Sequence, residues 1–354
     1  MPSESPVRFH YIDLLRGLSA LAVLIYHYRA FFVTAPDTWP PVVNLPLQGC
    51  LWPIYEYGRL AVQVFWVISG FVFAVAYARF GTQMSLWRFF VHRFARLYPL
   101  HFVMLILVAT IQAASFRFTG HFQVYGSNTP LDFIAQIFLA SNWLSAYRFT
   151  FNGPVWSVSV EILIYLAFVV YLKLFTPRLL SAGAIAISFF VLAVVTERPV
   201  TQCGALFFTG VCIGLTRKSA TSRLGIFGVA GLLITLALCV MGNQYQATAA
   251  LSYLAGPSAV AILAHLDLRL PTLSSRFWWI GDITYAVYLT HMPLIMVVRL
   301  LIGDRSVLHA PAGMLAFVLS VVLISVFIHR SFEIPMQRYI RSAMARPILR
   351  VRKE

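Results

Sequence analysis

The sequence predicts an all-α polytopic membrane protein with about ten transmembrane helices, first of all from its composition. Hydrophobic residues make up 60% of the 354 residues, and charged residues make up only 11%. So few charged side chains cannot cover a chain of this size in water, whereas lipid solvates apolar side chains. The composition therefore excludes an ordinary soluble protein. We expect a single membrane domain over residues 1–354, with its core at about 9–340.

The spacing of apolar stretches gives the number of helices. A helix that crosses a bilayer needs roughly 17 to 25 apolar residues. In chain order the ten candidate stretches are residues 11–33, 59–79, 97–116, 155–175, 179–196, 201–216, 224–241, 247–265, 281–302 and 311–330. An even number of spans puts both termini on one side. Two connecting segments, 34–58 and 117–154, are long, and we expect a short helix or re-entrant piece at 131–143.

Charge predicts the orientation. The formal net charge is +15, and basic segments of membrane proteins face the cytoplasm. With both termini in the cytoplasm, most basic residues outside the helices fall on that side. We expect the tail at 341–354 to act as a basic cytoplasmic segment that is attracted to anionic lipid. The charge therefore has an explanation that needs no nucleic-acid partner.

The first predicted helix carries ionisable residues, which are costly in a membrane and therefore indicate candidate sites. Arg16 and His27 are 11 residues apart, which at about 100° per residue returns them to one helix face, roughly 16 Å apart. Asp13 lies one turn before Arg16 and can pair with it. An alternative is that Arg16 is an interfacial anchor that snorkels to the membrane surface.

Glu161 is the only acid well inside a predicted span. The helical rise puts it roughly 10 Å from the outer end of its helix and puts His27 roughly 9 Å deep, so we expect the two to meet. A carboxylate fixes the tautomer and raises the basicity of an imidazole that takes a proton from a hydroxyl. A structural polar pair between helices explains the same spacing, and the residues leave both explanations open.

Other residues are candidates for the same site. Arg93 and Arg96 are one helical turn apart and can clamp phosphates, although a topology signal explains them equally well. Ser69 precedes Gly70 where a close helix approach or a narrow channel would need small residues. We expect the following polar or small residues to line the cavity: Asp13, Ser69, Trp156, Ser157, Tyr288 and His291.

Signatures of soluble enzymes are missing from the sequence. It contains no GxSxG, P-loop or HExxH pattern,. Its four cysteines have no zinc-ligand spacing,. We therefore expect no metal and no permanently bound cofactor.

Taken together, these motifs resemble those of the acyltransferase 3 family of bacterial integral membrane acyltransferases. The most specific element is Arg16, ten intervening residues and His27, within DLLRGLSALAVLIYH. The other elements, in order, are FWVISGF, Arg93 and Arg96 before Tyr98 and Pro99, WSVSVE with Glu161, GDITYAVYLTHMPL, and Glu333 before Pro335. Each element alone is weak, but their order and spacing are specific. The resemblance runs from the first helix to residue 339.

The resemblance implies a membrane O-acyltransferase of the bacterial inner membrane. Such an enzyme moves an acyl group, commonly acetyl, from cytoplasmic acyl-CoA to a hydroxyl of an extracytoplasmic glycan, such as lipopolysaccharide, exopolysaccharide or an oligosaccharide. Arg16, Arg93 and Arg96 would hold the donor, and His27, oriented by Glu161, would act as the general base. A covalent acyl-enzyme on Ser157 or a tyrosine stays open. Some members carry an appended domain, and we expect this chain to be a stand-alone version.

Two functions from other classes stay open. One is a transporter or flippase of a lipid-linked glycan, with Arg16, Glu161 and His291 along its path. The other is a non-catalytic membrane scaffold in which these residues serve helix packing. The sequence has no visible internal repeat, which disfavours a repeat-built transporter. No sequence pattern identifies the acceptor, the position modified, the acyl chain length or the oligomeric state.

Overall fold

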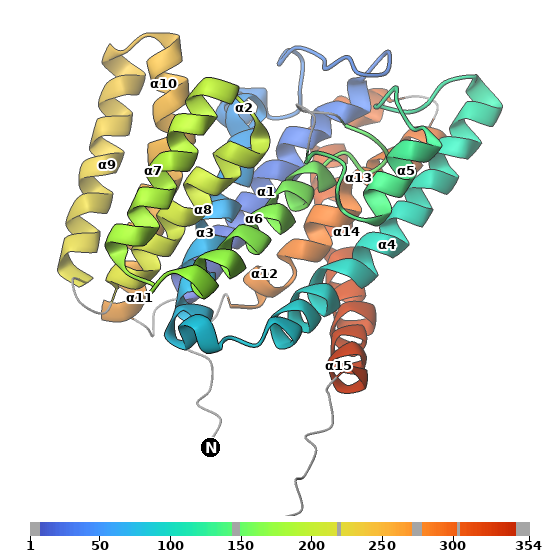
Figure 1. The fold of residues 1–354 in the computed structure, drawn as a ribbon. Helices are drawn as coiled ribbons and strands as arrows, with labels where there is room; N and C mark the ends of the chain where they lie inside the picture. Colours follow the sequence, from blue (N-terminus) through green and yellow to red (C-terminus); the bar gives the residue numbers. More distant parts are fainter. Residues whose placement is uncertain (1–7, 144–148, 218–220, 271–277, 303–304, 345–354) are drawn as a thin grey trace, which may run out of the picture.

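A computed structural model describes residues 8–143, 149–217, 221–270, 278–302 and 305–344. Within these ranges all regular secondary structure is helical, which confirms the predicted fold class. Figure 1 shows a bundle of long helices that run in roughly the same direction. Most of the predicted basic tail lies outside the described residues, because they end at residue 344.

In these ranges ten long helices build the bundle. They are α1 (His10–His27), α3 (Ala61–Tyr77), α4 (Leu86–Thr119), α6 (Val155–Leu174), α7 (Leu179–Thr196), α8 (Pro199–Thr216), α9 (Thr221–Met241), α11 (Gly256–Arg269), α13 (Thr284–Leu301) and α14 (Pro311–Ile328). Five short helices accompany them: α2 (Gln48–Tyr57), α5 (Pro130–Ile137), α10 (Gln244–Ala250), α12 (Trp278–Asp282) and α15 (Ile334–Ala343). Two π-helical segments make the longer helices continuous, since η4 (Leu251–Ala255) joins α10 to α11 and η6 (His329–Glu333) joins α14 to α15.

The chain is a multi-pass membrane protein. In the described ranges, nine helical segments are long and apolar enough to cross a membrane, and they match the second to tenth predicted spans. The first predicted span corresponds to α1, which is as long as α7. Asp13 and Arg16 make α1 less apolar than the nine. It lies inside the bundle, packed against α3, α11, α12 and α13.

Helix α4 differs from the prediction. The predicted span begins at residue 97, but the helix already begins at Leu86. The Ser85 hydroxyl caps it by accepting the Arg88 backbone N–H at 3.3 Å,. The apolar run ends at the arginines, but the helix continues through them, because arginine is a good helix former. The helix is therefore longer than the predicted span, and Arg93 and Arg96 project from one continuous helix.

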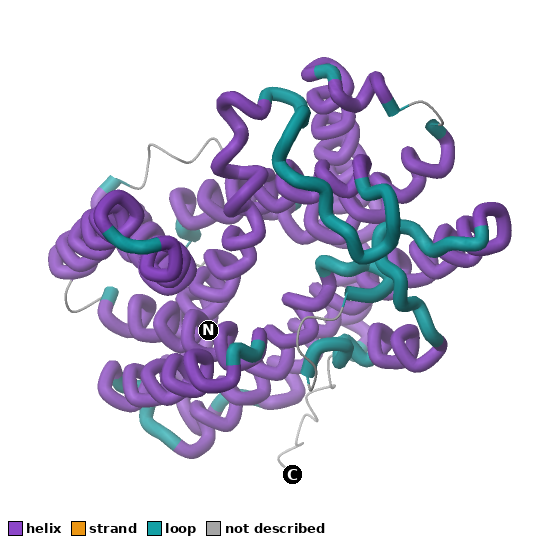
Figure 2. Tube along the Cα trace, turned by 90° about the horizontal axis from the view of Figure 1, so that it is seen from above, coloured by secondary structure: helices purple, strands orange, loops and turns teal. Residues whose placement is uncertain are grey.

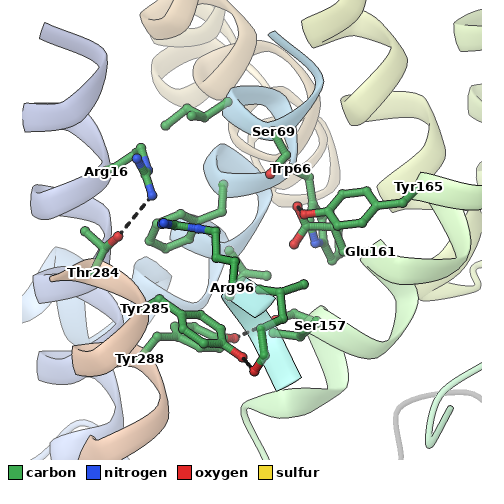
Figure 3. Close-up of a pocket in the computed structure, with 15 residues that line it drawn as sticks. Arg16, Trp66, Ser69, Arg96, Ser157, Glu161, Tyr165, Thr284, Tyr285 and Tyr288 are labelled. Carbon is green, nitrogen blue, oxygen red and sulfur yellow. Dashed lines mark hydrogen bonds between the residues drawn. The ribbon is translucent and has the colours of Figure 1, made fainter. Parts of the chain in front are cut away.

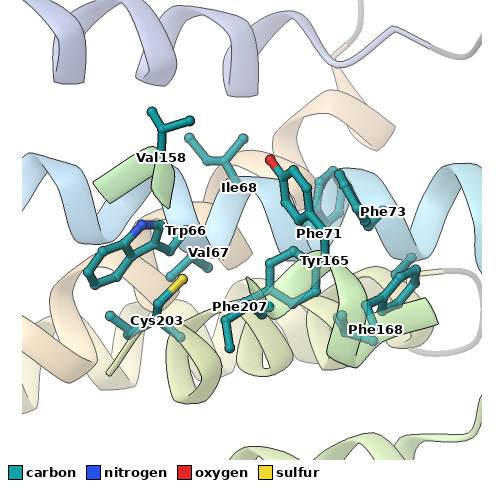
Figure 4. Packing of buried hydrophobic residues seen from close by; sticks show 14 of the residues in the cluster. Trp66, Val67, Ile68, Phe71, Phe73, Val158, Tyr165, Phe168, Cys203 and Phe207 are labelled. Atoms are coloured by element: carbon teal, nitrogen blue, oxygen red, sulfur yellow. The ribbon is translucent and has the colours of Figure 1, made fainter. Parts of the chain in front are cut away.

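Aromatic side chains and glycines pack the interior between α3, α6 and α8. Trp66 and Phe73 of α3 and Phe207 of α8 belong to one buried cluster (Figure 4). A Cβ atom on Gly70 would overlap the backbone carbonyl of Phe207. The close helix approach predicted at Ser69 and Gly70 is therefore confirmed, and α8 is the partner helix.

The outer helices and the loops divide the surface. Large apolar side chains of α7 and α9 are exposed, as expected for faces that contact lipid, and α9 forms one edge of the bundle (Figure 1). The connecting loops gather over one part of the bundle end (Figure 2). There the two long connecting segments, 34–58 and 117–154, touch, because the Asp37 carboxylate accepts the Gly126 N–H at 3.1 Å. The short helix predicted at 131–143 is present as α5.

Candidate active site

Two cavities lie along the centre of the bundle. The first, of about 110 Å³, is lined by polar residues of five helices, namely Arg16, Ser69, Arg96, Ser157, Glu161, Tyr165 and Thr284. The second, of about 300 Å³, is lined mainly by aromatic and amide side chains, among them Tyr26, His27, Trp39, Gln63, Tyr125, Trp156 and Gln202. Val62, Trp66 and Tyr288 line both cavities. These three residues therefore form the boundary between them.

Arginines dominate the first cavity, shown in Figure 3. The Arg16 guanidinium donates to the Asp13 carboxylate at 3.2 Å and to the Thr284 hydroxyl at 3.3 Å. Arg96 extends into the cavity (Figure 3), and no hydrogen bond holds its guanidinium among the described residues. The positive charge of Arg96 is close enough to that of Arg16 for the two to repel each other. Cations held together in a low-dielectric site attract an anion.

Arg93 does not line the first cavity, but it adds positive charge next to it. Its guanidinium carbon lies 4.9 Å from the centre of the Phe73 ring, a cation–π contact. One Nη donates to the Tyr77 hydroxyl at 3.5 Å, whereas the buried Nε has no hydrogen-bond partner in the described part of the chain. An unpaired donor on a buried cation is costly. Arg93 and Arg96 thus offer N–H groups that an anionic ligand can use.

Glu161 belongs to the arginine cavity. Its Oε1 accepts the Tyr165 hydroxyl at 2.7 Å, and Ser69 lies opposite (Figure 3). The carboxylate lies within electrostatic range of Arg93 and Arg16. Glu161 therefore balances part of the arginine charge.

The structure does not form the predicted pair between His27 and Glu161. His27 lines the second cavity and Glu161 the first, with Trp66 and Tyr288 at the boundary between them. The helical rise gives the depth of each residue but not the direction of its side chain. Glu161 points toward Ser69 of α3, whereas the ring of His27 packs against α13. The expectation that Glu161 orients His27 is therefore corrected.

A backbone carbonyl orients His27 instead. The Nδ1 of His27 lies 2.9 Å from the carbonyl oxygen of Val23. A carbonyl only accepts, so in the neutral ring Nδ1 carries the hydrogen and Nε2 keeps its lone pair. This Nε2 has no hydrogen-bond partner among the described residues, and His27 lines the second cavity. The arrangement fits a general base that faces the second cavity.

His291 stands behind His27 and has the same tautomer. Its Nδ1 lies 3.1 Å from the Val287 carbonyl oxygen, four residues earlier on α13. The two imidazole rings are 4.9 Å apart, centre to centre. His291 is fully buried, and its Nε2 has no hydrogen-bond partner in the described ranges. It lines neither central cavity, so its predicted place in a cavity wall is corrected.

Tyr288 and Ser157 join α13 to the start of α6. Their hydroxyl oxygens are 2.6 Å apart, and the Tyr288 hydroxyl also donates to the Pro154 carbonyl at 2.9 Å. Trp66, beside them, has an indole N–H that is buried without a partner in the part of the chain that the structure describes. The boundary therefore holds one unused donor next to a fixed pair of hydroxyl groups.

The remaining predicted site residues are divided between the cavities. Ser69 and Ser157 line the first cavity, Trp156 lines the second, and Tyr288 lines both. Asp13 does not line either cavity, contrary to the prediction, and it contacts Arg16, which lines the first.

Most residues of the second cavity were not predicted from the sequence, and Trp39, Gln63 and Gln202 are among them. The position of Trp39 in a long connecting segment was a usable signal, because such segments often carry functional residues. The two glutamines lie in apolar runs that give no comparable signal.

The turn before α6 shapes the wall of the second cavity. Gly153 lies so close to the Tyr125 ring that a Cβ atom would overlap it. Tyr125 lies in the loop between α4 and α5, and burial raises the pKa of its phenol,. The Tyr125 hydroxyl therefore stays protonated at neutral pH.

No metal centre is evident in the described residues, which contain no group of three histidine, cysteine or acidic side chains able to hold an ion. The arrangement offers instead a cationic cavity, a donor-bearing boundary and an imidazole with a free lone pair.

Comparisons with known proteins identify the family of the chain. A family model described as an acyltransferase domain (Acyl_transf_3) matches residues 9–330. The acyltransferase MdmB of Streptomyces mycarofaciens is 29% identical over 172 residues, which cover 48% of this chain and 40% of MdmB. Protein 2 in the picA locus of Rhizobium radiobacter is 27% identical over 183 residues, 46% of this chain and 82% of that protein.

A third relative aligns over most of the chain. The peptidoglycan O-acetyltransferase OatA of Listeria monocytogenes is 25% identical over 332 residues, which cover 80% of this chain and 49% of OatA. The chain thus spans half or less of the length of MdmB and OatA. No solved structure matches it significantly.

Proposed function

The chain belongs to the acyltransferase 3 family, and from this premise we propose that it is a membrane O-acyltransferase. It takes an acyl group from acyl-CoA at the first cavity and transfers it to a hydroxyl of a glycan in the second cavity. The observation that carries the proposal is the shared boundary of the two cavities at Trp66 and Tyr288. On one side lie arginines with unused N–H donors, and on the other lies an imidazole with a free Nε2.

The donor side fits an acyl thioester of CoA. The nucleotide end of CoA carries phosphates, which guanidinium groups bind through paired N–H donors. Arg93 and Arg96 have such donors without partners among the described residues, and Arg16 adds a third positive charge. The first cavity, about 110 Å³ in volume, suits a short acyl group at the end of the pantetheine arm. We therefore propose acetyl as the acyl group.

The acceptor side fits a sugar. Trp39, Tyr26 and Trp156 supply flat apolar walls, and Gln63 and Gln202 supply amide groups. A site with aromatic walls and a few polar groups holds a ring that has apolar faces and hydroxyl edges. The name of OatA, a peptidoglycan O-acetyltransferase, supports a glycan as acceptor.

The proposed transfer takes place at the boundary between the two cavities. His27 Nε2 takes the proton of the acceptor hydroxyl as its oxygen bonds to the thioester carbonyl carbon. The carbonyl oxygen gains negative charge, which the unpaired indole N–H of Trp66 stabilises. The tetrahedral intermediate then collapses, the C–S bond breaks, and CoA leaves as a thiolate that takes the proton back from His27. No permanently bound cofactor takes part.

The proposed setting is the bacterial inner membrane, with both termini in the cytoplasm. The basic residues outside the helices lie mostly on the side of the termini, which supports this orientation. The first cavity then opens toward cytoplasmic acyl-CoA, and the second toward the extracytoplasmic glycan.

The test is turnover of the thioester by purified protein in lipid nanodiscs. With acetyl-CoA and an envelope glycan extract, we expect release of free CoA and an acetylated glycan detectable by mass spectrometry. A protein that moves glycan across sealed vesicles without releasing CoA would instead be a transporter. Failure of both assays with folded protein would favour a scaffold.

A further inference from the structure

The helix α15, close to the end of the described residues, brings a fourth arginine to the donor side. It packs along α4, beside the segment that carries Arg93 and Arg96, and Figure 1 shows it extending past the neighbouring helices. The guanidinium of Arg341 is close enough to Arg93 and Arg96 for the charges to repel one another. In the sequence alone, Arg341 is one of several tail cations and nothing distinguishes it from the others.

A ladder of side chains holds Arg341 in this position. The Nδ1 of His329 lies 2.7 Å from one carboxylate oxygen of Glu333, and the Gln337 amide donates to the other at 3.3 Å. The Arg341 guanidinium donates to the Gln337 amide oxygen at 3.0 Å. These residues recur every four positions and therefore line one face of the helix. Glu333 is buried, so the ladder has a fixed base.

A second contact fixes the end of α15. The indole N–H of Trp87, at the start of α4, donates to the Met344 carbonyl at 2.9 Å. This bond and the ladder hold the backbone on both sides of Arg341. The guanidinium is thus partly ordered before any ligand arrives, which lowers the entropy that binding has to offset.

The positive charges at this site are poorly compensated. Arg93 has a buried Nε without a partner, and Arg96 makes no hydrogen bond within the described ranges. Glu161 is an acid in range of Arg93, and Gln337, which holds Arg341, is neutral. Arginines placed side by side repel each other unless an anion lies between them.

We propose that Arg341, Arg93 and Arg96 form a phosphate-binding site at the mouth of the first cavity, which takes the phosphates of the nucleotide end of the donor. The inference rests on the proposed function and names a residue that the family motifs do not include. The first cavity holds about 110 Å³, far too little for a nucleotide, so the phosphates stay at its mouth. The exposed Arg341 stands there, beside the arginine that lines the cavity.

The test compares Arg341→Gln with Arg338→Gln in nanodiscs of zwitterionic phosphatidylcholine. Arg338 is on the same helix, is exposed, and its substitution changes the net charge equally. Each variant is assayed with acetyl-CoA and with acetyl-pantetheine, which has the thioester but lacks the nucleotide and its phosphates. Turnover of acetyl-pantetheine also reports that the variant is folded.

We expect Arg341→Gln to raise KM for acetyl-CoA by roughly 10- to 100-fold, the effect of one lost charge-assisted hydrogen bond. The value of kcat should stay within about twofold, because the phosphates are remote from the reacting carbonyl. Arg338→Gln should behave as the wild type with both donors. With acetyl-pantetheine, Arg341→Gln should match the wild type.

Other outcomes overturn the proposal. An equal KM increase with acetyl-pantetheine, or in Arg338→Gln, would mean that Arg341 does not act on the phosphates. An effect seen only when anionic lipid is added to the nanodiscs would assign Arg341 to a lipid headgroup. A wild type that turns over both thioesters, with Arg341→Gln unchanged, would refute this inference alone. A wild type that turns over neither would refute the proposed function as well.

Discussion

The imidazole rings of His27 and His291 lie 4.9 Å apart, and each Nδ1 is bound to the backbone carbonyl four residues earlier in its own helix. Two helices, α1 and α13, therefore present two imidazoles that share one tautomer when neutral, and neither Nε2 has a hydrogen-bond partner within the described residues. Glu161 takes no part in this pair. The orientation of the proposed base thus depends on helix geometry, which a change at Glu161 leaves in place.

His291 is expected to assist His27. When His27 accepts a proton, the neighbouring neutral imidazole stabilises the resulting cation in a buried site. His291→Phe keeps the aromatic packing and removes Nε2, and we expect kcat to fall roughly tenfold, less than the 10²- to 10⁴-fold loss of a general base. The KM for acetyl-CoA should not change, because the donor occupies the first cavity, which His291 does not line. Steady-state kinetics with both substrates checks this, and an unchanged kcat would assign His291 to packing alone.

Trp66 is expected to stabilise the oxyanion. Its buried indole N–H has no partner among the described residues, and the side chain lines both cavities. Trp66→Phe removes the donor but keeps an aromatic ring, and kcat should fall on the order of 10²- to 10³-fold, as for other lost oxyanion donors. The readout is CoA release with the glycan acceptor present. Trp156→Phe, which changes the second cavity alone, serves as control, and equal losses in the two variants would contradict the assignment.

Glu161 is expected to act on the arginines and not on His27. Glu161→Gln removes a negative charge within range of Arg93 and Arg16, so the repulsion among the arginines increases. We expect the free energy of unfolding to fall by about 1 to 3 kcal/mol, the cost of a buried charge that loses its partner. Tyr165→Phe, which removes the donor to the same carboxylate, should cost less. Thermal unfolding in detergent measures both, and the pH dependence of turnover should keep its wild-type shape.

Gly70 tests the packing that holds α3 in place. Gly70→Ala puts a methyl group against the Phe207 carbonyl, and overpacking of this kind costs about 1 to 3 kcal/mol,. At Gly183, in the lipid-facing helix α7, a Cβ atom would meet open space, with no described atom within 4 Å. Gly183→Ala should therefore stabilise the helix by up to about 1 kcal/mol. Comparable unfolding temperatures for the two variants would count against the close approach of α3 and α8.

Much of the fold is predictable because nine of the predicted spans are long and apolar by themselves within the described residues. The boundaries of α7 match the predicted stretch at 179–196. The prediction fails where a helix contains polar residues. At the start of α4, arginines interrupt the apolar run but not the helix. It is incomplete at α14, which continues through η6 into α15 as far as Ala343.

The sequence predicts most of the individual site residues, but it does not predict which of them contact each other. Arg16, Arg96 and Glu161 line one cavity and His27 another, although depth alone put His27 and Glu161 at one level. Which neighbour a side chain faces depends on the rotation of each helix in the bundle, which no single helix encodes. The sequence could not single out Arg341 for the same reason, since only the packing of α15 on α4 brings it close to Arg93 and Arg96.

The central claim is that His27 removes the proton of the acceptor hydroxyl. The most direct measurement is transfer of labelled acetyl from acetyl-CoA to the glycan extract by His27→Asn, with His309→Asn, which lines neither cavity, as control. The account predicts a loss of transfer of roughly 10²- to 10⁴-fold in His27→Asn, with CoA binding unchanged because His27 lies outside the first cavity. Wild-type transfer by a folded His27→Asn protein would contradict it.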